Sequence, residues 1–346
     1  MRNVKTGWRR GCLLLGTGVL LAVGITACGS SGGSNTLVLY NGQHTETTDA
    51  LVSAFEHKTG IEVSVRTNDE DVLADQIVQE GANSPADLIF TENSPALEYL
   101  QGKNLLAPVD ASTLSMVSSK DNSPDGDWVG VSARVSVLVY NTTMLRPSQL
   151  PTSVLALAQP QWKGELAIAP SETDFQPIVS AVAKAYGEQA ALKWLEGIKT
   201  NGLSHEYADN ETITSSVNSG QAEIGIINQY YWYRLRAESG SAAMHSAIAF
   251  FTPRDPGYVE DISGAAILKS THHLRQAQEF LAFIVSKQGQ EIIAQADSFE
   301  YPLFPGVAAA DGQPPLASLQ PYPITVAELG DGSFPVSLMT KVGLVT

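Results

Sequence analysis

Cysteine is scarce in this 346-residue chain: there are only Cys12 and Cys28, and both lie near the N-terminus. The chain after residue 35 therefore has no thiol, which excludes a disulfide or a thiolate metal site there. Basic residues are also few, with 21 Lys and Arg against 36 Asp and Glu. Such an acidic balance argues against binding to nucleic acid or to anionic lipid headgroups. Beyond residue 35 there is also no nucleophile elbow, His-Glu-x-x-His segment or phosphate loop.

The first 35 residues resemble a bacterial lipoprotein leader. Four basic residues precede an apolar stretch, 12–23, that is too short to span a bilayer comfortably, and Ile-Thr-Ala-Cys28 closes it. A Gly/Ser segment, 29–34, follows as a flexible tether. The pattern predicts that Cys28 is lipidated and anchors the protein to the outer face of the cytoplasmic membrane. An ordinary signal peptide or an uncleaved anchor is the alternative.

The rest of the chain has a globular composition, with 43 % hydrophobic and 16 % charged residues. Its length exceeds what one hydrophobic core usually organises, so two lobes are expected. The first half alternates predicted strands and helices at 36–40, 49–58, 61–65, 70–80 and 86–90. This β-α-β-α-β order implies a parallel sheet, in which ligands bind beyond the carboxyl ends of the strands. His44 and Glu92 follow the first and third strands, so both are expected at that edge.

The second half continues the same α/β pattern without a fixed-period repeat. Residues 128–140 alternate in a β-like way and predict a strand that crosses between the lobes. The other predicted elements are strands at 164–169, 222–227 and 264–268, and helical regions at 177–199, 231–239 and 274–294.

Two adjacent phenols, Tyr230 and Tyr231, follow directly on one of these predicted strands. Neighbouring residues of a strand point to opposite faces of the sheet. The two side chains can therefore share one target only if the strand has already ended. An adjacent tyrosine pair is more often a packing feature than a ligand pair, so its meaning depends on its surroundings.

Five segments together give the chain a family resemblance. They are Tyr40-Asn-Gly-Gln-His44, Pro85-Ala-Asp-Leu-Ile-Phe-Thr-Glu92, Ile226-Ile-Asn-Gln-Tyr-Tyr-Trp232, Asp255-Pro-Gly257 with Ser263-Gly-Ala-Ala266, and Glu300-Tyr-Pro-Leu303. In this order and spacing they resemble the bacterial ferric-ion-binding proteins, which are the periplasmic or lipoprotein receptors of iron ABC importers. The resemblance extends over nearly the whole chain beyond the leader.

The resemblance implies a two-lobed periplasmic-binding-protein type II fold, in which each lobe has a mixed, mostly parallel sheet flanked by helices and hinge strands connect the lobes. It places the N-lobe at residues 36–133 and about 261–311, and the C-lobe at about 134–260 and 312–346. The family function implied is capture of one Fe³⁺ in the cleft between the lobes and delivery to an ABC permease. The iron source is a ferric ion or a ferric chelate, and the receptor is expected to be a monomer.

The resemblance also implies a ligand set: His44, Glu92, Tyr230 and Tyr231. The chemistry agrees, because ferric iron favours anionic oxygen and accepts imidazole. Two phenolates and one carboxylate balance the three charges of the ion, and His44 adds a neutral nitrogen. About two octahedral positions are left for water or a synergistic anion.

One segment departs from the family pattern. The small-residue turn that binds the anion in many members corresponds here to Pro170-Ser-Glu-Thr-Asp174, in which Glu172 and Asp174 flank Thr173. These acidic residues argue against a phosphate site, and we expect phosphate to be dispensable. The other residues that the resemblance places near the anion are Asn93, Arg134, Asn210 and Asn228. Arg134 is expected to offset the extra carboxylates.

Two other functions stay open at this point. A protein of the same fold can instead bind a polyamine, an organic anion or a thiamine-like molecule. A Tyr/His/Glu set can also belong to a hydrolytic or redox enzyme, with Glu172 and Asp174 as acid and base. The tyrosine pair favours iron over the other ligands, and the lack of a nucleophile elbow, a His-Glu-x-x-His segment and a phosphate loop argues against the enzyme.

Overall fold

The first three strands run parallel and bring two predicted ligands to one edge of the sheet. The computed structural model describes residues 36–346, so the predicted leader, tether and Cys28 lie outside the described residues. Strand β1 (Leu37–Gly42) pairs in parallel with β2 (Val63–Thr67) and β3 (Leu88–Thr91). Because Gly42 lies opposite Thr91 in this register, the chain leaves both strands side by side, and His44 and Glu92 follow immediately.

Helices α1 and α2 make the crossovers between these strands. Helix α1 (Thr45–Thr59) ends at Gly60, whose φ of 72° is the left-handed conformation that glycine adopts without a steric penalty. Helix α2 (Glu70–Glu80) has the predicted bounds. Strand β2 begins two residues later than predicted, because the chain is still leaving the helix cap at Ile61.

The second group of elements places the tyrosines. Strand β6 (Leu166–Ala167) pairs in parallel with β7 (Ile224–Asn228), and the helices of this half are α5 (Gln176–Tyr186), α6 (Glu188–Gly202), α7 (Asn210–Ser219) and α8 (Gln229–Ser239). The predicted long helical region is two helices separated by Gly187, with a φ of 87°. Strand β7 ends at Asn228, so Tyr230 and Tyr231 lie in the first turn of α8, as their convergence requires.

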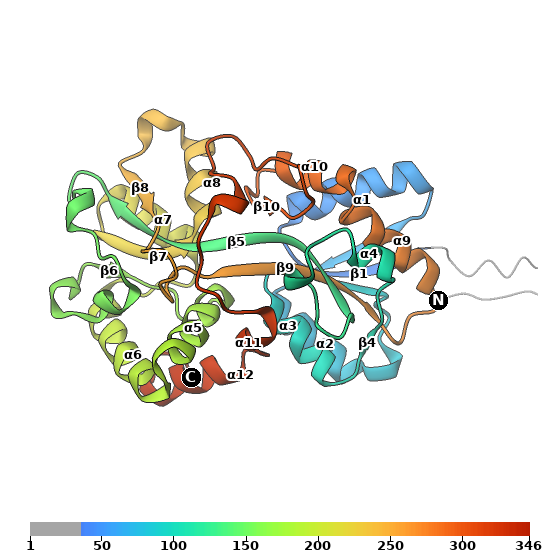
Figure 1. Cartoon of the computed structure of the whole chain (residues 1–346), viewed down its shortest axis with the longest axis horizontal. Helices are drawn as coiled ribbons and strands as arrows, with labels where there is room; N and C mark the ends of the chain where they lie inside the picture. Colours follow the sequence, from blue (N-terminus) through green and yellow to red (C-terminus); the bar gives the residue numbers. More distant parts are fainter. Residues whose placement is uncertain (1–35) are drawn as a thin grey trace, which may run out of the picture. The chain divides into compact units, whose positions relative to one another are not determined.

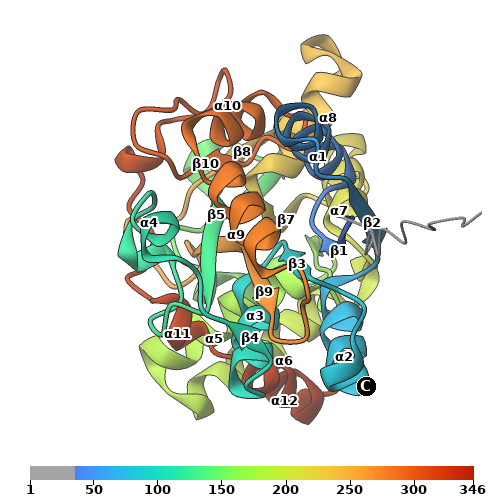
Figure 2. The ribbon, with the colours of Figure 1, turned by 90° about the vertical axis from the view of Figure 1, so that its right-hand side faces the viewer.

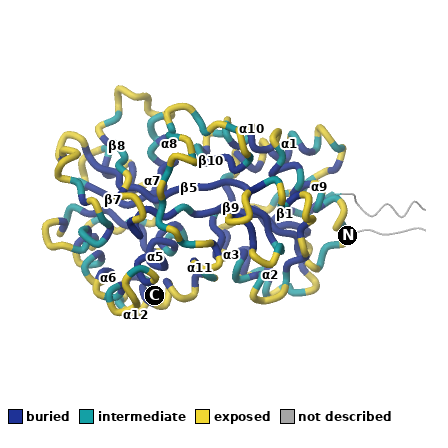
Figure 3. Tube along the Cα trace, in the orientation of Figure 1, coloured by how far each residue is buried: buried dark blue, intermediate teal, exposed yellow. Residues whose placement is uncertain are grey.

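Two long strands join the halves of the molecule (Figure 1). Strand β5 (Trp128–Asn141) pairs antiparallel with β9 (Glu260–Leu268) along its first part and with β7 and β8 (Ser246–Ala249) along its second part. The order of strands along the sheet is β2-β1-β3-β9-β5-β7-β6. Every residue of β5 is buried, and Figure 3 shows these strands as the buried centre of the molecule. The crossing strand predicted at 128–140 is therefore confirmed.

The remaining elements cover the outside of this sheet. They are α3 (Ser94–Gly102), β4 (Leu106–Ala107), α4 (Ala111–Leu114), α9 (Leu274–Ile284), α10 (Lys287–Gln295), β10 (Tyr301–Pro302), α11 (Val326–Leu329) and α12 (Ser333–Val342). Helices α9 and α10 pack against α1 (Figure 2). The rings of Phe55 and Phe280 meet edge to face, with centroids 5.1 Å apart. Helix α12 packs on α5 and α6. In residues 36–346 no helix is both long and apolar enough to cross a bilayer.

The predicted mixed α/β fold with connecting strands is confirmed. The lobe limits near residues 133 and 260 stay a prediction, since β5 and β9 belong to both halves and the described residues, 36–346, form one compact unit.

Candidate metal centre

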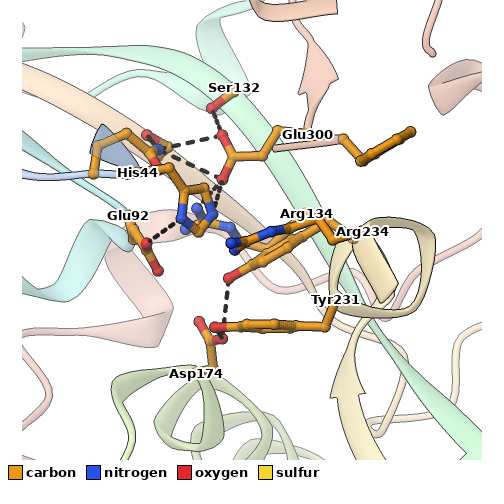
Figure 4. Close-up of polar contacts among 12 residues, drawn as sticks. His44, Glu92, Ser132, Arg134, Asp174, Tyr231, Arg234 and Glu300 are labelled. Carbon is orange, nitrogen blue, oxygen red and sulfur yellow. Dashed lines mark hydrogen bonds and ion pairs between the residues drawn. The ribbon is translucent and has the colours of Figure 1, made fainter. Parts of the chain in front are cut away.

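All four predicted ligands lie close together, and Figure 4 shows three of them, His44, Glu92 and Tyr231. The Nδ1 atom of His44 lies 3.0 Å from Oε1 of Glu92. The ring of Tyr230 meets the His44 ring edge to face, with centroids 5.0 Å apart. Tyr231 is the next residue in the chain, and its ring centroid lies 4.1 Å from that of Tyr230. Tyr230 and Tyr231, hereafter the tyrosine pair, are buried. Loops after β1 and β3 therefore supply an imidazole and a carboxylate, and helix α8 supplies two phenols.

The hydroxyls of the tyrosine pair donate hydrogen bonds to the turn that precedes α5, residues 170–174, hereafter the acidic turn. The Tyr231 hydroxyl lies 3.0 Å from Oδ2 of Asp174 and 3.1 Å from Oε1 of Glu172. The Tyr230 hydroxyl lies 3.4 Å from the same Asp174 oxygen. The turn that departs from the family pattern thus contacts the phenols directly.

Burial sets the protonation of the site. It raises the pKa of both members of the tyrosine pair well above 10, and the charge of Asp174 raises both further. Burial is also the main reason that the pKa of Glu92 rises, against the opposing effect of Arg134. For His44, burial lowers the pKa, so the ring is neutral at pH 7 and has a lone pair for a metal.

Behind the ligands lies a fully buried ion pair. The Arg134 guanidinium contacts the Glu300 carboxylate, and both side chains have 0 % exposure. Glu300 also accepts hydrogen bonds from the Ser132 hydroxyl and, at 3.2 Å, from the Gln43 amide. Arg134 further lies over the Tyr230 ring, with Cζ 5.7 Å from its centroid. Arg134 was expected to offset Glu172 and Asp174, but its direct partner is Glu300.

Asn93 ties the two halves together across the site. Its amide nitrogen donates to Glu70 at 3.0 Å, to the Thr173 hydroxyl at 3.1 Å and to Oδ1 of Asp174 at 3.2 Å. Its oxygen accepts from Arg134 at 3.2 Å. Burial, together with the charge of Glu92, raises the pKa of the Glu70 carboxyl to about 8.

The two other asparagines predicted near the anion, Asn210 and Asn228, differ in their contacts with the site. The Asn210 amide donates to Oδ2 of Asp174 at 3.0 Å and so belongs to the site. Asn228 is the residue before α8, and its backbone pairs with Ser136. Among the described residues, no hydrogen bond links the Asn228 side chain to the ligands or to the acidic turn.

A cleft of about 620 Å³ opens onto this site, and residues of both halves line it. Carboxylates dominate the lining, with Arg234 as the cation among the lining residues. The acidic side chains are Glu46, Asp69, Glu70, Asp71, Glu92, Glu172, Asp209 and Glu211. A cleft of this charge attracts cations and repels multivalent anions.

The candidate metal site includes the tyrosine pair. In residues 36–346 no group of three or more His, Cys, Asp and Glu is placed to hold a metal ion. Together with the tyrosine pair, however, His44 and Glu92 supply one nitrogen and three oxygens that can carry three negative charges. That donor set suits a small, hard, trivalent cation.

Three polar residues of the site had no role assigned from the sequence: Gln43, Glu70 and Glu300. Glu300 lies in one of the segments that carry the resemblance, but a glutamate in sequence does not reveal that it is buried. For Gln43 the signal was its position directly before His44, at the ligand edge of β1.

The fold and the cleft define a two-lobed solute-binding protein that holds a small ligand between its halves. The profile of the bacterial extracellular solute-binding protein family matches residues 83–325. The chain belongs to this family and, within it, to the ferric-ion-binding proteins.

Named relatives agree over almost the full length. The chain is 40 % identical to the "Fe(3+)-binding periplasmic protein" of Serratia marcescens, over 96 % of each chain. Iron-bound HitA from Pseudomonas aeruginosa is 41 % identical, with a TM-score of 0.85 over 89 % of this chain and 99 % of that one. A Trichodesmium protein, IdiA (FutA), solved in complex with iron and citrate, is 30 % identical with a TM-score of 0.78, over 89 % and 99 % of the two chains.

Proposed function

We propose that this protein captures one ferric ion in its cleft outside the cytoplasm and delivers it to an ABC importer, acting by binding and not by catalysis. The ligands are His44, Glu92 and the tyrosine pair. One observation carries the proposal: two neighbouring phenols in the first turn of α8 face the imidazole and carboxylate that follow β1 and β3. The names of the relatives support ferric iron as the cargo.

The site releases protons as it takes up the metal. A cation close to a phenol strongly favours the phenolate, although burial alone holds the proton on. Glu92 and two phenolates then neutralise Fe³⁺, and neutral His44 completes a four-ligand set without a net charge. Such a set needs no anion from solvent to balance the charge of the ion.

Capture is coupled to closure of the two halves. The ligands come from loops on opposite sides of the strands β5 and β9, so a bound ion stabilises the form in which the halves are in contact. The hydrogen bond of 3.1 Å from Asn93 to Thr173 belongs to that closed form. We propose residues 36–133 with 261–311, and 134–260 with 312–346, as the two lobes, and the importer recognises the closed arrangement.

The protein acts on a tether at the outer face of the cytoplasmic membrane, as a monomer. The sequence of the leader supports lipidation of Cys28, and the extracellular family and periplasmic relatives support an extracytoplasmic location.

An optical titration of the metal-free protein with ferric citrate tests the proposal. The wild type should develop a visible phenolate-to-iron charge-transfer band that saturates near one equivalent. The double variant Tyr230→Phe/Tyr231→Phe should not. Tyr233→Phe is the matched control, because Tyr233 lies on the same helix but donates to the Gly312 carbonyl at 3.0 Å. It should titrate like the wild type. A wild type without the band refutes ferric binding at this site and directs attention to an organic ligand.

A further inference from the structure

The chain that follows β10 forms a second pocket, apart from the cleft. In Figure 1 this segment crosses β5 and β9 before it reaches α11, and the Tyr322 backbone nitrogen ties it to the Tyr258 carbonyl at 2.7 Å. A pocket of about 630 Å³, hereafter the strap pocket, is lined mainly by residues 301–309 and by the segment 313–321. No residue lines both this pocket and the cleft. A ligand in the strap pocket therefore contacts none of the residues that line the cleft.

The walls of the strap pocket are mostly apolar. Leucine, valine, alanine and phenylalanine side chains from residues 303–319 contribute to them. Four more lining residues are prolines: Pro302, Pro305, Pro315 and Pro321. Because proline has no backbone N–H and a fixed φ, these positions offer no backbone donor and keep the wall stiff. A preformed apolar pocket of this size suits a small organic molecule.

The charged groups that line the strap pocket are already paired. They are Lys120, Asp121 and Glu260. The Nζ atom of Lys120 lies 2.9 Å from Oε1 of Glu260 and 3.2 Å from Oδ1 of Asp121. The lysine side chain is 61 % exposed, so these pairs lie at the solvent end of the pocket. A charged ligand would gain little there, because exposed ion pairs contribute little and both signs are present. The pocket therefore favours a neutral ligand.

One buried polar group of the strap pocket has no partner. Tyr301 is 0 % exposed, and its hydroxyl makes no hydrogen bond within residues 36–346. Burial raises the pKa of this phenol, so it keeps its proton at neutral pH and is a donor. A buried donor without an acceptor costs about 1–3 kcal/mol.

Neighbouring polar side chains do have partners. The Tyr233 hydroxyl donates to the Gly312 carbonyl at 3.0 Å. The amide of Gln313, which lines the pocket, donates to the Phe299 carbonyl at 2.9 Å and accepts from Gln229 at 3.3 Å. The Tyr301 hydroxyl is thus the group that is left to recognise a ligand.

We propose that the strap pocket is a second ligand site, for a neutral and largely apolar small molecule that carries a carbonyl oxygen. The apolar body of the ligand packs against the proline-rich wall, and its oxygen accepts the hydrogen bond from Tyr301. A carbonyl suits this donor better than a hydroxyl does, because it brings no proton that needs an acceptor of its own. The site lies outside the ferric centre, so each can be refuted without the other.

Prodan, a neutral fluorescent naphthyl ketone, is the probe for this site. Its emission should shift to the blue on titration with the protein and saturate near one equivalent. Acetophenone and ethylbenzene then compete with it, since they have nearly the same size and only acetophenone has a carbonyl oxygen. Acetophenone should displace Prodan at a concentration about tenfold lower, as expected for one hydrogen bond to a donor that is otherwise unsatisfied.

Tyr301→Phe removes the donor and keeps the ring. Acetophenone should lose its advantage over ethylbenzene in this variant, while the affinity for ethylbenzene stays as in the wild type. Its Tm should not fall, because the missing hydroxyl had no hydrogen bond to lose. Tyr233→Phe is the matched control. It should keep the preference for acetophenone, because Tyr233 does not line the pocket.

Leu316→Trp tests the location of the probe. Leu316 lines the strap pocket and is partly buried, so the larger ring fills the space, and Prodan should no longer bind. Absence of saturable Prodan binding to the wild type overturns the inference. Equal displacement by the two competitors, a preference for acetophenone that survives in Tyr301→Phe, or full binding by Leu316→Trp overturns it as well. Loss of the ferric charge-transfer band would instead refute the iron site alone.

Discussion

The buried pair of Arg134 and Glu300 allows a quantitative test of how the site is supported. Both side chains are fully buried, and removal of one partner of such a pair leaves the other charge without compensation. That loss typically costs about 3–5 kcal/mol. We expect Glu300→Gln to lower the free energy of unfolding of the metal-free protein by this amount at every pH from 5 to 8, because a guanidinium cannot shed its proton in that range.

Removal of the other partner, Arg134, should give a stability penalty that depends on pH. In Arg134→Met the stranded group is a carboxyl, which can become neutral by taking up a proton. The native state then binds one proton more than the unfolded state, so stability falls as pH rises. At about 1.4 kcal/mol per pH unit, the penalty relative to the wild type should grow by up to about 4 kcal/mol between pH 5 and pH 8.

Urea unfolding of four metal-free proteins measures both effects. These are the wild type, the two single variants and Arg134→Met/Glu300→Gln, compared at pH 5 and pH 8 by tryptophan fluorescence and far-UV circular dichroism. The double variant keeps neither charge of this pair, so its penalty should be smaller than the sum of the single penalties. A cost below about 1 kcal/mol for Glu300→Gln, or an Arg134→Met penalty that does not change with pH, would refute this account of the pair.

Three further outcomes are expected. Burial raises the pKa of Glu92 and of the tyrosine pair, so ferric binding at pH 7 should release two to three protons. The apparent affinity for iron should therefore fall about tenfold per displaced proton for each pH unit of acidification. Release of fewer than two protons in a weakly buffered titration would contradict this. Glu92→Gln should weaken ferric binding at least about tenfold with an unchanged circular dichroism spectrum, and unaltered affinity would remove Glu92 from the ligand set. Gly130→Ala should destabilise the protein by about 1–3 kcal/mol, because its Cβ would collide with the Asp121 carbonyl oxygen, whereas Gly102→Ala has open space and should leave Tm within a few degrees.

The family resemblance implied which residues are ligands, and their positions at the sheet edge were accessible from sequence because that placement is local. A strand that ends at Gly42 puts His44 at the sheet edge, and a strand that ends at Asn228 puts the next residues into the first turn of a helix. Short-range patterns of apolar and polar residues predict strands that end at residues 40 and 227, within two residues of the observed ends. The parallel pairing of β1 and β3 then follows from the β-α-β order, and it brings Glu92 beside His44.

The sequence showed that the acidic turn departs from the family pattern, but it did not show which residues the turn contacts. Asp174 contacts residues 36 to 81 positions away, from both halves of the molecule. Composition shows that it is acidic, and only the closed arrangement shows that amides and phenols surround it. Its environment depends on how the halves meet.

The sequence by itself determined the α/β class, the crossing strand and the edge where the ligands gather, because these depend on periodicity and on the ends of individual strands. The tertiary structure decided which charges are buried and which partners they have. Arg134 and Glu300 are 166 residues apart, and the sequence around neither residue indicates that the two form a pair. Their pairing results from the packing of β5 against β10, a contact between distant parts of the chain. Burial then makes the electrostatic interactions of the site strong enough to set its protonation and its choice of cation.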